Sequence, residues 1–475
     1  MSRFSIWWTV SFVLLIASCS LAPKYRRPEP ITPSQWKNVS RPTITTSTYL
    51  VSKDWWKKFG SSELDRLMTE SLNNNLDLAA ARERVGQFRA LAKIAGAPLW
   101  PAISATGSYN YSNSGSSGNV NSSGGISNIS GNGLNSNSNS WRGQWNMSYE
   151  VDLWGGIRAG RDSAKSHLAN AGFSLNALRL VVMGDVAQSY FAIVGLKERK
   201  LIAENNLNNI KEVLAIIVTR FEAGATSALE VAQQKTELAN AAAAVAQLDQ
   251  QIAQSENALA VLLGRAPQQF KVGEKNLQPI AIPKADVSQP SILLDRRPDI
   301  HSAEAELIAA HADIGKARAA FYPRLQLSEA NIFTAVTIAQ PAGVGIALAS
   351  ALTAPIFQGG SIEGELERTL ARRTELLEIY RKTILTAYQE VEDALALGSQ
   401  STRRREQLLL SVDSAKQAYE IARDRFLAGA TDYQTLLIVQ RSLLNAQDSE
   451  IQAHVDVLTA AVLLFKSMGG GWSYR

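Results

Sequence analysis

The stretch W-R-G-Q-W-N-M-S-Y-E-V-D-L-W, residues Trp141–Trp154, carries apolar side chains at its odd positions and polar ones at its even positions. Only Gly143 and the final tryptophan interrupt the alternation. Because successive side chains of a strand point to opposite faces, the segment predicts a ribbon with one apolar and one polar face. Aromatic residues near both ends of the apolar face favour a strand that faces lipid. A half-buried strand of a soluble sandwich has the same pattern, so this stretch alone leaves both interpretations open.

Three other segments alternate in the same way, and together they predict two hairpins. We expect strands at about 101–111 and 141–154, and at about 323–334 and 343–357. The first pair is joined by residues 112–140, which are almost entirely Ser, Asn and Gly. This linker contains no Asp, which excludes the Asp-containing calcium-binding glycine repeats. It cannot bury apolar surface, so we expect a long solvated loop, as on the outer side of outer-membrane barrels.

Helical periodicity fills most of the remaining sequence. Proline and glycine mark the helix ends. The Ala- and Gln-rich composition of residues 227–263 favours close helix packing in a thin wall with water near both sides. The expected helices run from Ser62 to Ala97, Ile157 to Phe221, Ser227 to Leu263, Ile362 to Leu427 and Asp432 to Met468.

The second half of the chain repeats the first. The segment R-F-E-A-G-A-T, Arg220–Thr226, returns as R-F-L-A-G-A-T, Arg425–Thr431. The glycine pair 155–156 likewise returns at 359–360. Matching anchors in matching order indicate an internal duplication of a helix–hairpin–long helix–helix unit.

The duplication sets the expected domain boundaries. We predict a signal peptide at 1–18, an N-terminal tether at 19–60 and a first repeat at 61–264. A connector at 265–297, a second repeat at 298–468 and a tail at 469–475 follow.

The N-terminus has the form of a secretory signal. Arg3 precedes an apolar run from Ile6 to Ala17, and I-A-S-C then ends at Cys19, the single cysteine of the protein. This ending resembles a bacterial lipobox, which implies that Cys19 is acylated and heads the mature chain. By the same resemblance, Ser20 in place of the usual retention Asp points to the outer membrane.

Composition excludes several other functions. The formal net charge of +5 is spread along 475 residues, without the concentrated basic face that nucleic-acid binding requires. No uninterrupted apolar run reaches the 18 residues of a membrane-spanning helix. The four histidines lack metal-ligand spacing, and no G-x-S-x-G, Walker A or H-E-x-x-H pattern occurs. We therefore expect neither an enzyme nor a bound cofactor, apart from the lipid on Cys19.

Four strands cannot close a barrel, since about eight is the smallest number that does. Open sheet edges are not tolerated in hydrocarbon. If the apolar faces contact lipid, several copies must share one barrel, and three copies supply twelve strands.

Several motifs resemble the outer-membrane efflux lipoproteins of the TolC superfamily, of the OprM/NodT-like kind. These are C-S-L-A-P-K-Y-R-R-P (19–28), L-L-D-R-R-P-D-I (293–300), A-R-A-A-F-Y-P-R-L (317–325), the two R-F-x-A-G-A-T turns and the terminal G-G-G-W (469–472). The resemblance covers essentially the whole mature chain. It implies a mainly α protein with a membrane β-barrel, in which a homotrimer forms a twelve-stranded outer-membrane barrel continuous with a long periplasmic helical barrel.

The resemblance also implies a function. Such proteins passively conduct substrates, including drugs, from an inner-membrane RND-type pump and a periplasmic adaptor (membrane fusion) protein to the exterior of a Gram-negative cell. The alternative is a surface-anchored structural or adhesin lipoprotein with a helical stalk. The duplicated hairpin argues against a stalk, which has no need of two equivalent barrel pieces per chain.

The resemblance places candidate sites at the two turns. The expected periplasmic tips that meet the adaptor are Arg220, Phe221, Gly224, Thr226, Arg425, Phe426, Gly429 and Thr431. The glycines also fit ordinary helix ends in tight turns.

A gate is expected just after the second turn. Many relatives have L-L-D-A-Q-R here, and this Asp and Arg help to hold the pore shut; this chain has L-L-I-V-Q-R, with Ile438 at the Asp position and Arg441 retained. Either an apolar constriction replaces the carboxylate ring, or another acidic residue nearby serves, unless these charged residues only form a solvated helix face. The gate candidates are Asp424, Asp432, Gln434, Ile438 and Arg441.

Overall fold

The computed structural model describes residues 21, 23–29, 32–38, 53–114, 136–283, 289–337, 340–470 and 472. The predicted signal peptide, Cys19, most of the loop 112–140 and parts of the tether, connector and tail lie outside the described residues. The chain divides into two compact units. A sheet-bearing unit comprises residues 1–27, 87–168 and 306–376, and a helical unit comprises residues 28–86, 169–305 and 377–475.

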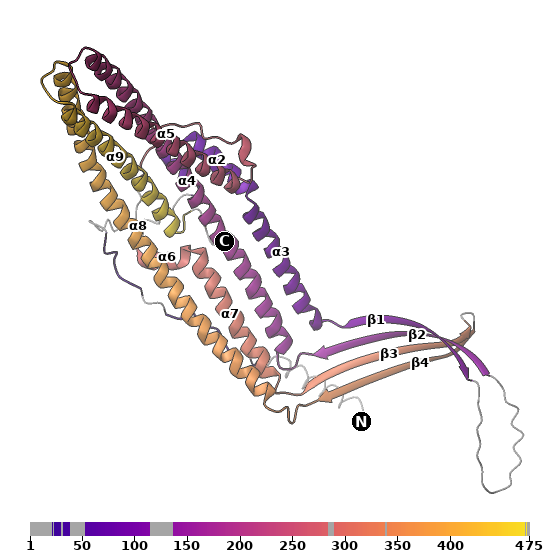
Figure 1. Ribbon diagram of the computed structural model, residues 1–475. Helices are drawn as coiled ribbons and strands as arrows, with labels where there is room; N and C mark the ends of the chain where they lie inside the picture. The colour runs from indigo at the N-terminus through magenta and orange to yellow at the C-terminus, as the bar shows by residue number, and fades with distance from the viewer. Residues whose placement is uncertain are drawn as a thin grey trace, which may run out of the picture. The chain divides into compact units, whose positions relative to one another are not determined.

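Each half of the chain contains a strand hairpin and two helices that follow it (Figure 1). The first half comprises η1 (Trp55–Phe59), α2 (Ser62–Asn74), α3 (Leu76–Gly96), η2 (Ala97–Leu99), β1 (Ala102–Ser114), β2 (Ser136–Val151), α4 (Gly156–Glu222) and α5 (Ala228–Leu262). The second comprises η3 (Pro267–Gln269), α6 (Pro290–Arg296), α7 (Pro298–Ala319), β3 (Arg324–Thr337), β4 (Gln340–Thr353), α8 (Ser361–Leu427) and α9 (Tyr433–Ser467).

The helical segment expected at 62–97 is divided at Asn75, so the expectation of one helix was wrong. The side chain of Asn75 accepts a hydrogen bond from the backbone N–H of Leu78 at 3.0 Å and donates to the carbonyl of Leu262 at 2.9 Å. Asn competes with the backbone for hydrogen bonds and therefore favours helix caps over helix interiors. It ends α2 and starts α3.

The helices α5 and α9 each start one residue after the predicted boundary because their first predicted residues are N-caps. Ser227 accepts from the N–H of Glu230, and Asp432 accepts from that of Thr435. Side-chain oxygens of Ser and Asp satisfy the N–H groups that the first turn of a helix leaves unpaired.

The strands form one antiparallel sheet in the order β1-β2-β3-β4, with β1 and β4 at its edges. The strand β2 ends at Val151 rather than at Trp154. The carboxylate of Asp152 accepts hydrogen bonds from the N–H groups of Ile157 at 3.0 Å and Arg158 at 2.9 Å. The polar residue that seemed to continue the strand is thus a cap for the first turn of α4.

The core of the helical unit forms around the aromatic residues of η1. Trp55 and Phe59 are completely buried, and Trp55 stacks on Phe465 of α9 at 5.4 Å between ring centroids. Tyr190 of α4 donates to or accepts from Ser61 at 2.9 Å, so its hydroxyl is paired although its ring is buried. These aromatic residues belong to the segment D-W-W-K-K-F, Asp54–Phe59, at the end of the predicted tether, and they anchor it to this core.

Among the residues that the structure describes, one helix, α4, is long and apolar enough to cross a membrane by length and composition alone. Its best 18-residue window has a mean hydropathy of 1.4, although no uninterrupted apolar run of that length exists. Within this chain 56% of that window is buried, as in a core helix.

Candidate functional site

The four strands carry one continuous apolar face. Their register brings odd positions of β1, β2 and β3 and even positions of β4 to the same side, as in the pairs Ile103–Met147 and Leu325–Leu352. Large apolar side chains on this face are exposed: Ile103 70%, Trp145 66%, Val344 73%, Ile346 71% and Leu348 78%. The opposite face carries mainly Ser, Thr, Asn, Gln and Ala. This arrangement suits a sheet with apolar solvent on one side and water on the other.

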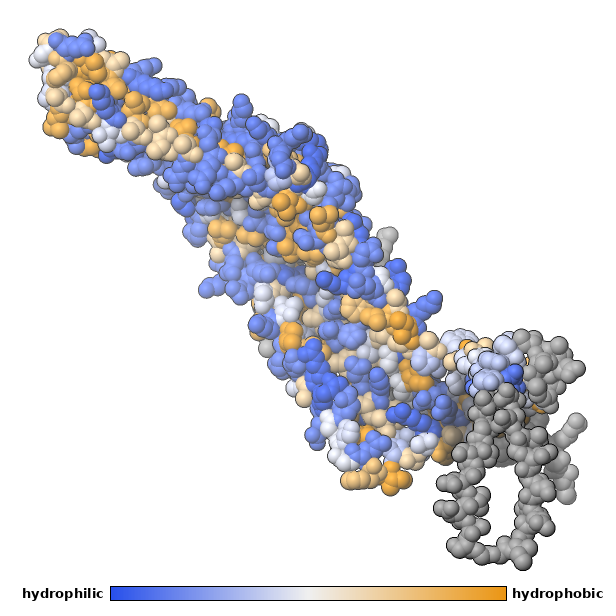
Figure 2. Space-filling view, turned by 45° about the vertical axis from the view of Figure 1, so that its right-hand side comes forward, coloured by the Kyte–Doolittle hydropathy of each residue, from blue (hydrophilic) through white to orange (hydrophobic). Residues whose placement is uncertain are grey.

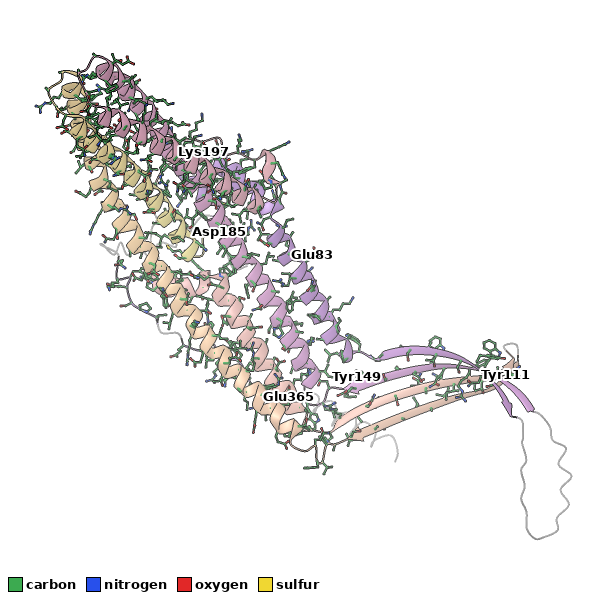
Figure 3. All side chains as sticks on the ribbon, in the orientation of Figure 1. Glu83, Tyr111, Tyr149, Asp185, Lys197 and Glu365 are labelled. Atoms are coloured by element: carbon green, nitrogen blue, oxygen red, sulfur yellow. The ribbon has the colours of Figure 1, made fainter. Side chains whose placement is uncertain are left out.

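The two ends of the sheet are rich in aromatic rings. Figure 3 shows Tyr149 near the end from which α4 leaves and Tyr111 near the other end. Tyr109 and Trp141 lie 4.8 Å apart between ring centroids, next to Tyr111. Such rings prefer the boundary between hydrocarbon and water, where the apolar ring and the polar tip are both satisfied.

A polar pair interrupts the apolar face, and the alternation of the sequence did not predict it. Glu329 and Asn331 of β3 both point to that side, and the Asn331 amide donates to the Glu329 carboxylate at 3.1 Å. The i, i+2 spacing was visible in the sequence, but it has meaning only once the register of β3 is known.

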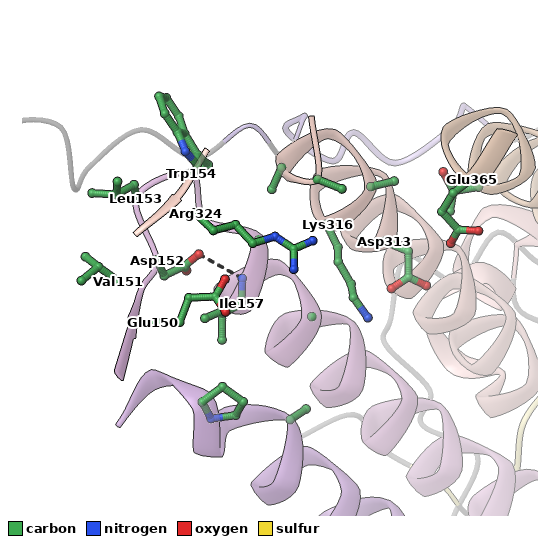
Figure 4. Close-up of a pocket in the computed structure, with 18 of the residues that line it drawn as sticks. Glu150, Val151, Asp152, Leu153, Trp154, Ile157, Asp313, Lys316, Arg324 and Glu365 are labelled. Atoms are coloured by element: carbon green, nitrogen blue, oxygen red, sulfur yellow. Dashed lines mark hydrogen bonds between the residues drawn. The ribbon is translucent and has the colours of Figure 1, made fainter. Parts of the chain in front are cut away.

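A cavity of about 610 Å³ lies where β2 runs into α4 and where α7 runs into β3. Its wall is strongly charged, and in the view of Figure 4 the cationic ends of Arg324 and Lys316 lie between the carboxylates of Glu150 and Asp313. Above it, Trp154 donates through Nε1 to the carbonyl of Pro323 at 2.8 Å. The lining combines acidic and basic side chains at this charged junction and includes no His, Cys or Ser.

The two predicted turns have the same backbone. Ala225 N–H donates to the Arg220 carbonyl at 2.8 Å, and Ala430 N–H donates to the Arg425 carbonyl at 2.8 Å. Gly224 and Gly429 both have positive φ, at 76° and 73°, which favours glycine because a Cβ would be strained. The duplicated sequence thus folds into duplicated helix ends.

The side chains at the two turns differ. Arg220 donates to the carbonyls of Phe426 and Leu427 at 3.0 and 2.9 Å, and its guanidinium lies 4.8 Å from the centre of the Phe426 ring. Phe426 is 3% exposed, whereas Phe221, its counterpart, is 44% exposed. Thr226 donates to Glu230. Arg220 therefore joins the end of α4 to the end of α8, a role that sequence spacing did not indicate.

The surface near these turns is apolar in patches. Figure 2 shows hydrophobic residues gathered where the helical pairs α4–α5 and α8–α9 turn. Phe221, Leu229 and Leu427 are 44%, 65% and 47% exposed there.

Most of the gate candidates make contacts within the chain. Asp432 caps α9, and hydrogen bonds from Thr435 hold its pKa below the usual range. Arg441 donates to Glu237 of α5 at 2.5 Å, and this hydrogen bond raises the pKa of Arg441.

The remaining candidates behave differently from one another. Asp424 pairs with the adjacent Arg423 at 3.2 Å. Ile438 is 60% exposed, and Gln434 is exposed as well.

A buried polar network beneath the turns was also missed. The Tyr433 hydroxyl donates to Gln234 Oε1, and Gln234 Nε2 donates to the Ile210 carbonyl at 2.9 Å. Burial raises the pKa of Tyr433 to about 12, so the hydroxyl remains a donor. Only the packing of α4, α5 and α9 brings these groups together.

No group of three or more His, Cys, Asp or Glu that could hold a metal ion occurs among the described residues. A sheet with an exposed apolar face, a polar opposite face and aromatic rings near its ends is typical of outer-membrane β-structure.

Comparison with known proteins identifies the family. The family model described as "Outer membrane efflux protein" matches residues 67–265 and 289–470, so the chain belongs to this family. The pyoverdine export outer membrane protein OpmQ of Pseudomonas aeruginosa is 37% identical over 98% of this chain and 96% of that protein. The probable outer membrane lipoprotein SilC of Salmonella typhimurium is 27% identical over 98% of each chain.

A solved structure agrees. The outer-membrane channel OprN matches with a TM-score of 0.84 and 28% identity, over 96% of this chain and 100% of that one. The chain is an outer-membrane efflux channel of a Gram-negative bacterium, a component of an efflux pump and not an enzyme. The expected fold class of long helices with β-hairpins, of the TolC type, is confirmed.

Proposed function

We propose that three copies of this chain form one twelve-stranded outer-membrane barrel that continues into a periplasmic helical barrel. The observation that carries the proposal is a four-stranded sheet with an exposed apolar face and two edges, β1 and β4, that have no partner strand in the described part of the chain. Strands of 13 to 16 residues reach roughly 43–53 Å, and tilted by about 40° they still span a hydrocarbon core of about 25–30 Å. Joining β1 of one copy to β4 of the next removes every edge.

The mass of the detergent-solubilised protein tests this assembly. Native mass spectrometry is expected to give three times the mass of the mature chain. A stable monomer in detergent-free buffer, with Trp145 shielded from solvent quenchers, would contradict the proposal.

This duct serves as the exit of a tripartite efflux system. The two turns contact a periplasmic adaptor, which couples the duct to an inner-membrane pump of the RND type. Exposed apolar residues at the turns support this contact, because exposed apolar patches rimmed by polar residues are typical of protein–protein interaction sites. Affinity purification of the crosslinked protein tests it, since the adaptor and pump should be recovered from wild-type cells. Loss of the adaptor is expected when Leu229 and Leu427 are both changed to Lys.

The pore closes near residues 426–441. Ile438 stands where a carboxylate is usual in the superfamily and is largely exposed, which supports an apolar constriction. The salt bridge from Arg441 to Glu237 supports a second element that holds α9 against α5. Planar-bilayer conductance of Ile438→Asp and Arg441→Ala proteins tests the gate. Arg441→Ala should conduct more than wild type because the salt bridge to Glu237 is lost, and Ile438→Asp should change the conductance because a carboxylate replaces the apolar side chain. Unchanged conductance in both would reject the gate.

Cys19 carries the lipid anchor. The similar protein SilC is described as a probable outer membrane lipoprotein, and this similarity and the lipobox-like sequence support the modification. Intact mass of the mature N-terminal peptide should show an acylated Cys19, and a Cys19→Ser protein should not be processed in the same way. An unmodified thiol at residue 19 would refute the anchor.

The cargo is a secreted polar metabolite of the pyoverdine type. The identity of 37% with a pyoverdine export protein over nearly the full chain supports this class. Deleting the gene should retain such a siderophore in the periplasm under iron limitation, which extracellular siderophore assays measure. Normal secretion by the deletion strain would exclude this cargo without excluding the duct.

A further inference from the structure

The two helical turns have equal backbones but unequal side-chain contacts, and the difference points to a contact between copies. In the internal duplication, Arg220, Phe221 and Glu222 correspond in sequence to Arg425, Phe426 and Leu427. The helices α4 and α8 end at equivalent positions, Glu222 and Leu427. Any contact present at one turn therefore has a defined counterpart at the other.

The contact of Arg220 is made within the chain. Arg220 reaches from α4 to the last carbonyls of α8 and covers the ring of Phe426. An arginine at the carboxyl end of a helix satisfies carbonyls that lack intrahelical partners and favours the negative end of the helix dipole. Stacking on an aromatic ring adds a cation–π contribution.

The corresponding contact of Arg425 is not made within the chain. Arg425 is exposed, and within the described residues no hydrogen bond or ion pair engages its guanidinium. The counterpart acceptor is the end of α4, where the Phe221 carbonyl accepts the Gly224 N–H at 2.9 Å and no side chain of the described residues donates to it. Phe221 is 44% exposed, and Glu222 is exposed and forms no ion pair in the described part of the chain.

We propose that Arg425 of one copy binds the end of α4 in the neighbouring copy, with its guanidinium over Phe221 and donating to the last carbonyls of that helix. The proposal rests on the proposed trimer. In a closed ring the ends of α4 and α8 alternate, so each α8 end faces an α4 end of the next copy. Repeating the contact closes a ring of six arginine–phenylalanine pairs, three within chains and three between them.

Charge complementarity distinguishes the two kinds of pair. The residue after the ring is Leu427 at the pair within the chain but Glu222 at the pair between copies. The carboxylate of Glu222 adds an opposite charge beside the incoming Arg425, in an exposed place where such pairs are weak and salt-sensitive. The pairs between copies are thereby sensitive to ionic strength, whereas the pairs within the chain are less so because Phe426 is buried.

Photocrosslinking tests the contact. A Phe221→p-benzoylphenylalanine protein, purified as the detergent-solubilised trimer and irradiated, should give covalent dimers and trimers on a denaturing gel. Peptide mapping should place the adducts in the last turn of α8. The matched control, Phe426→p-benzoylphenylalanine, should crosslink to the end of α4 within the same chain and leave monomers.

A second variant separates the arginine from mere proximity. Arg425→Ala should lower the crosslinking yield at Phe221 about fivefold or more, given that both a charge-assisted hydrogen bond and a cation–π contact are lost. Arg423→Ala, which removes a neighbouring exposed arginine paired with Asp424, should leave the yield within twofold of wild type, as expected for a weak exposed pair.

The outcomes are distinguishable. If native mass shows no trimer, the proposed assembly fails, and the contact fails with it. If the trimer forms but Phe221 gives no adducts between chains, or adducts unaffected by Arg425→Ala, the contact alone is overturned. Adducts that require added adaptor protein would assign Phe221 to that partner and would also overturn the proposal.

Discussion

Trp55 and Trp145 show how differently one residue type is used in two regions of this chain. In the helical unit Trp55 is 0% exposed and stacks on another aromatic ring, whereas in the sheet Trp145 is 66% exposed. The helical unit buries its apolar side chains in clusters formed by one copy. The sheet presents its apolar side chains outward, and in the proposed barrel lipid covers them. One region is therefore stabilised by internal packing and the other by its surroundings.

The comparison is tested most strongly by truncating the two tryptophans. Trp55→Ala should destabilise the protein by about 3–5 kcal/mol, because it removes a large buried ring and leaves a cavity. Trp145→Ala should cost about 1–2 kcal/mol or less, because it removes only surface that contacts lipid. Thermal unfolding of both proteins in detergent measures the difference, and equal losses would show that the sheet is packed inside a larger core.

Adjacent residues of β4 test which face meets lipid. Leu348→Arg should destabilise the membrane-inserted protein by about 2–4 kcal/mol if it lies near the bilayer midplane, because arginine on the lipid face is desolvated. Ala349→Arg places the same charge on the polar face and should be nearly neutral. Urea titration of the protein folded into liposomes compares them. Equal tolerance of both substitutions would disprove the assignment of faces.

Glycines compare a closely packed site of the helical unit with an open site of the sheet. Gly264 has a φ of 70°, and an added Cβ would lie 2.3 Å from the carbonyl oxygen of Asn74, so Gly264→Ala should cost about 2–3 kcal/mol. Gly143 of β2 has open space around it, and Gly143→Ala should be harmless. Gly224→Ala, with a similar φ and open space, isolates the backbone strain of about 1–2 kcal/mol. Chemical denaturation measures the loss of unfolding free energy in all three proteins. Equal losses for Gly264→Ala and Gly224→Ala would show that the backbone at Asn74 moves to make room for the added Cβ.

Two histidines give pH-dependent effects of opposite sign. Burial, with Arg405 adding to it, lowers the pKa of His454 to about 4, so neutral His454 favours the folded state. The unfolded value is 6.5, and stability is therefore fully present above that pH and falls by about 2 kcal/mol on going from pH 8 to pH 5. A His454→Gln protein should have a flatter pH dependence, measured by thermal unfolding.

His167 of the sheet-bearing unit contributes stability with the opposite pH dependence. Its hydrogen bond to Glu306 at 2.7 Å raises the pKa of His167, so this stability is present below pH 6.5 and is lost as the pH rises through the raised pKa. The pair is partly exposed, and the effect should remain below about 1 kcal/mol. The prediction would be contradicted if His454→Gln had the same pH dependence of stability as wild type, or if His167 contributed more to that pH dependence than His454.

Sequence periodicity predicted the elements well where a single face decides them. The alternation in β2, the proline and glycine ends of the helices and the duplicated turns all act through neighbouring residues along the chain. The division at Asn75 and the end of β2 before Asp152 were not predicted. Each of these side chains caps a helix, but in the sequence each also fits the periodic pattern of the element that precedes it. The domain boundaries and the tip and gate residues remain predictions, although the structure supplies contacts for most of them.

The sequence by itself determined which faces are apolar, where the helices turn, that the chain is duplicated and, through its motifs, the family to which it belongs. These properties depend on spacing, and spacing is written in the sequence. Only the tertiary structure decided that Arg220 donates hydrogen bonds to the end of α8, whereas Arg425 makes no such contact within the described residues. It also decided that Phe426 is buried while Phe221 is exposed, and that Gln234 and Tyr433 form one hydrogen-bond network. Nearly identical local sequences met different neighbours, because contacts between helices distant in sequence depend on packing rather than on periodicity.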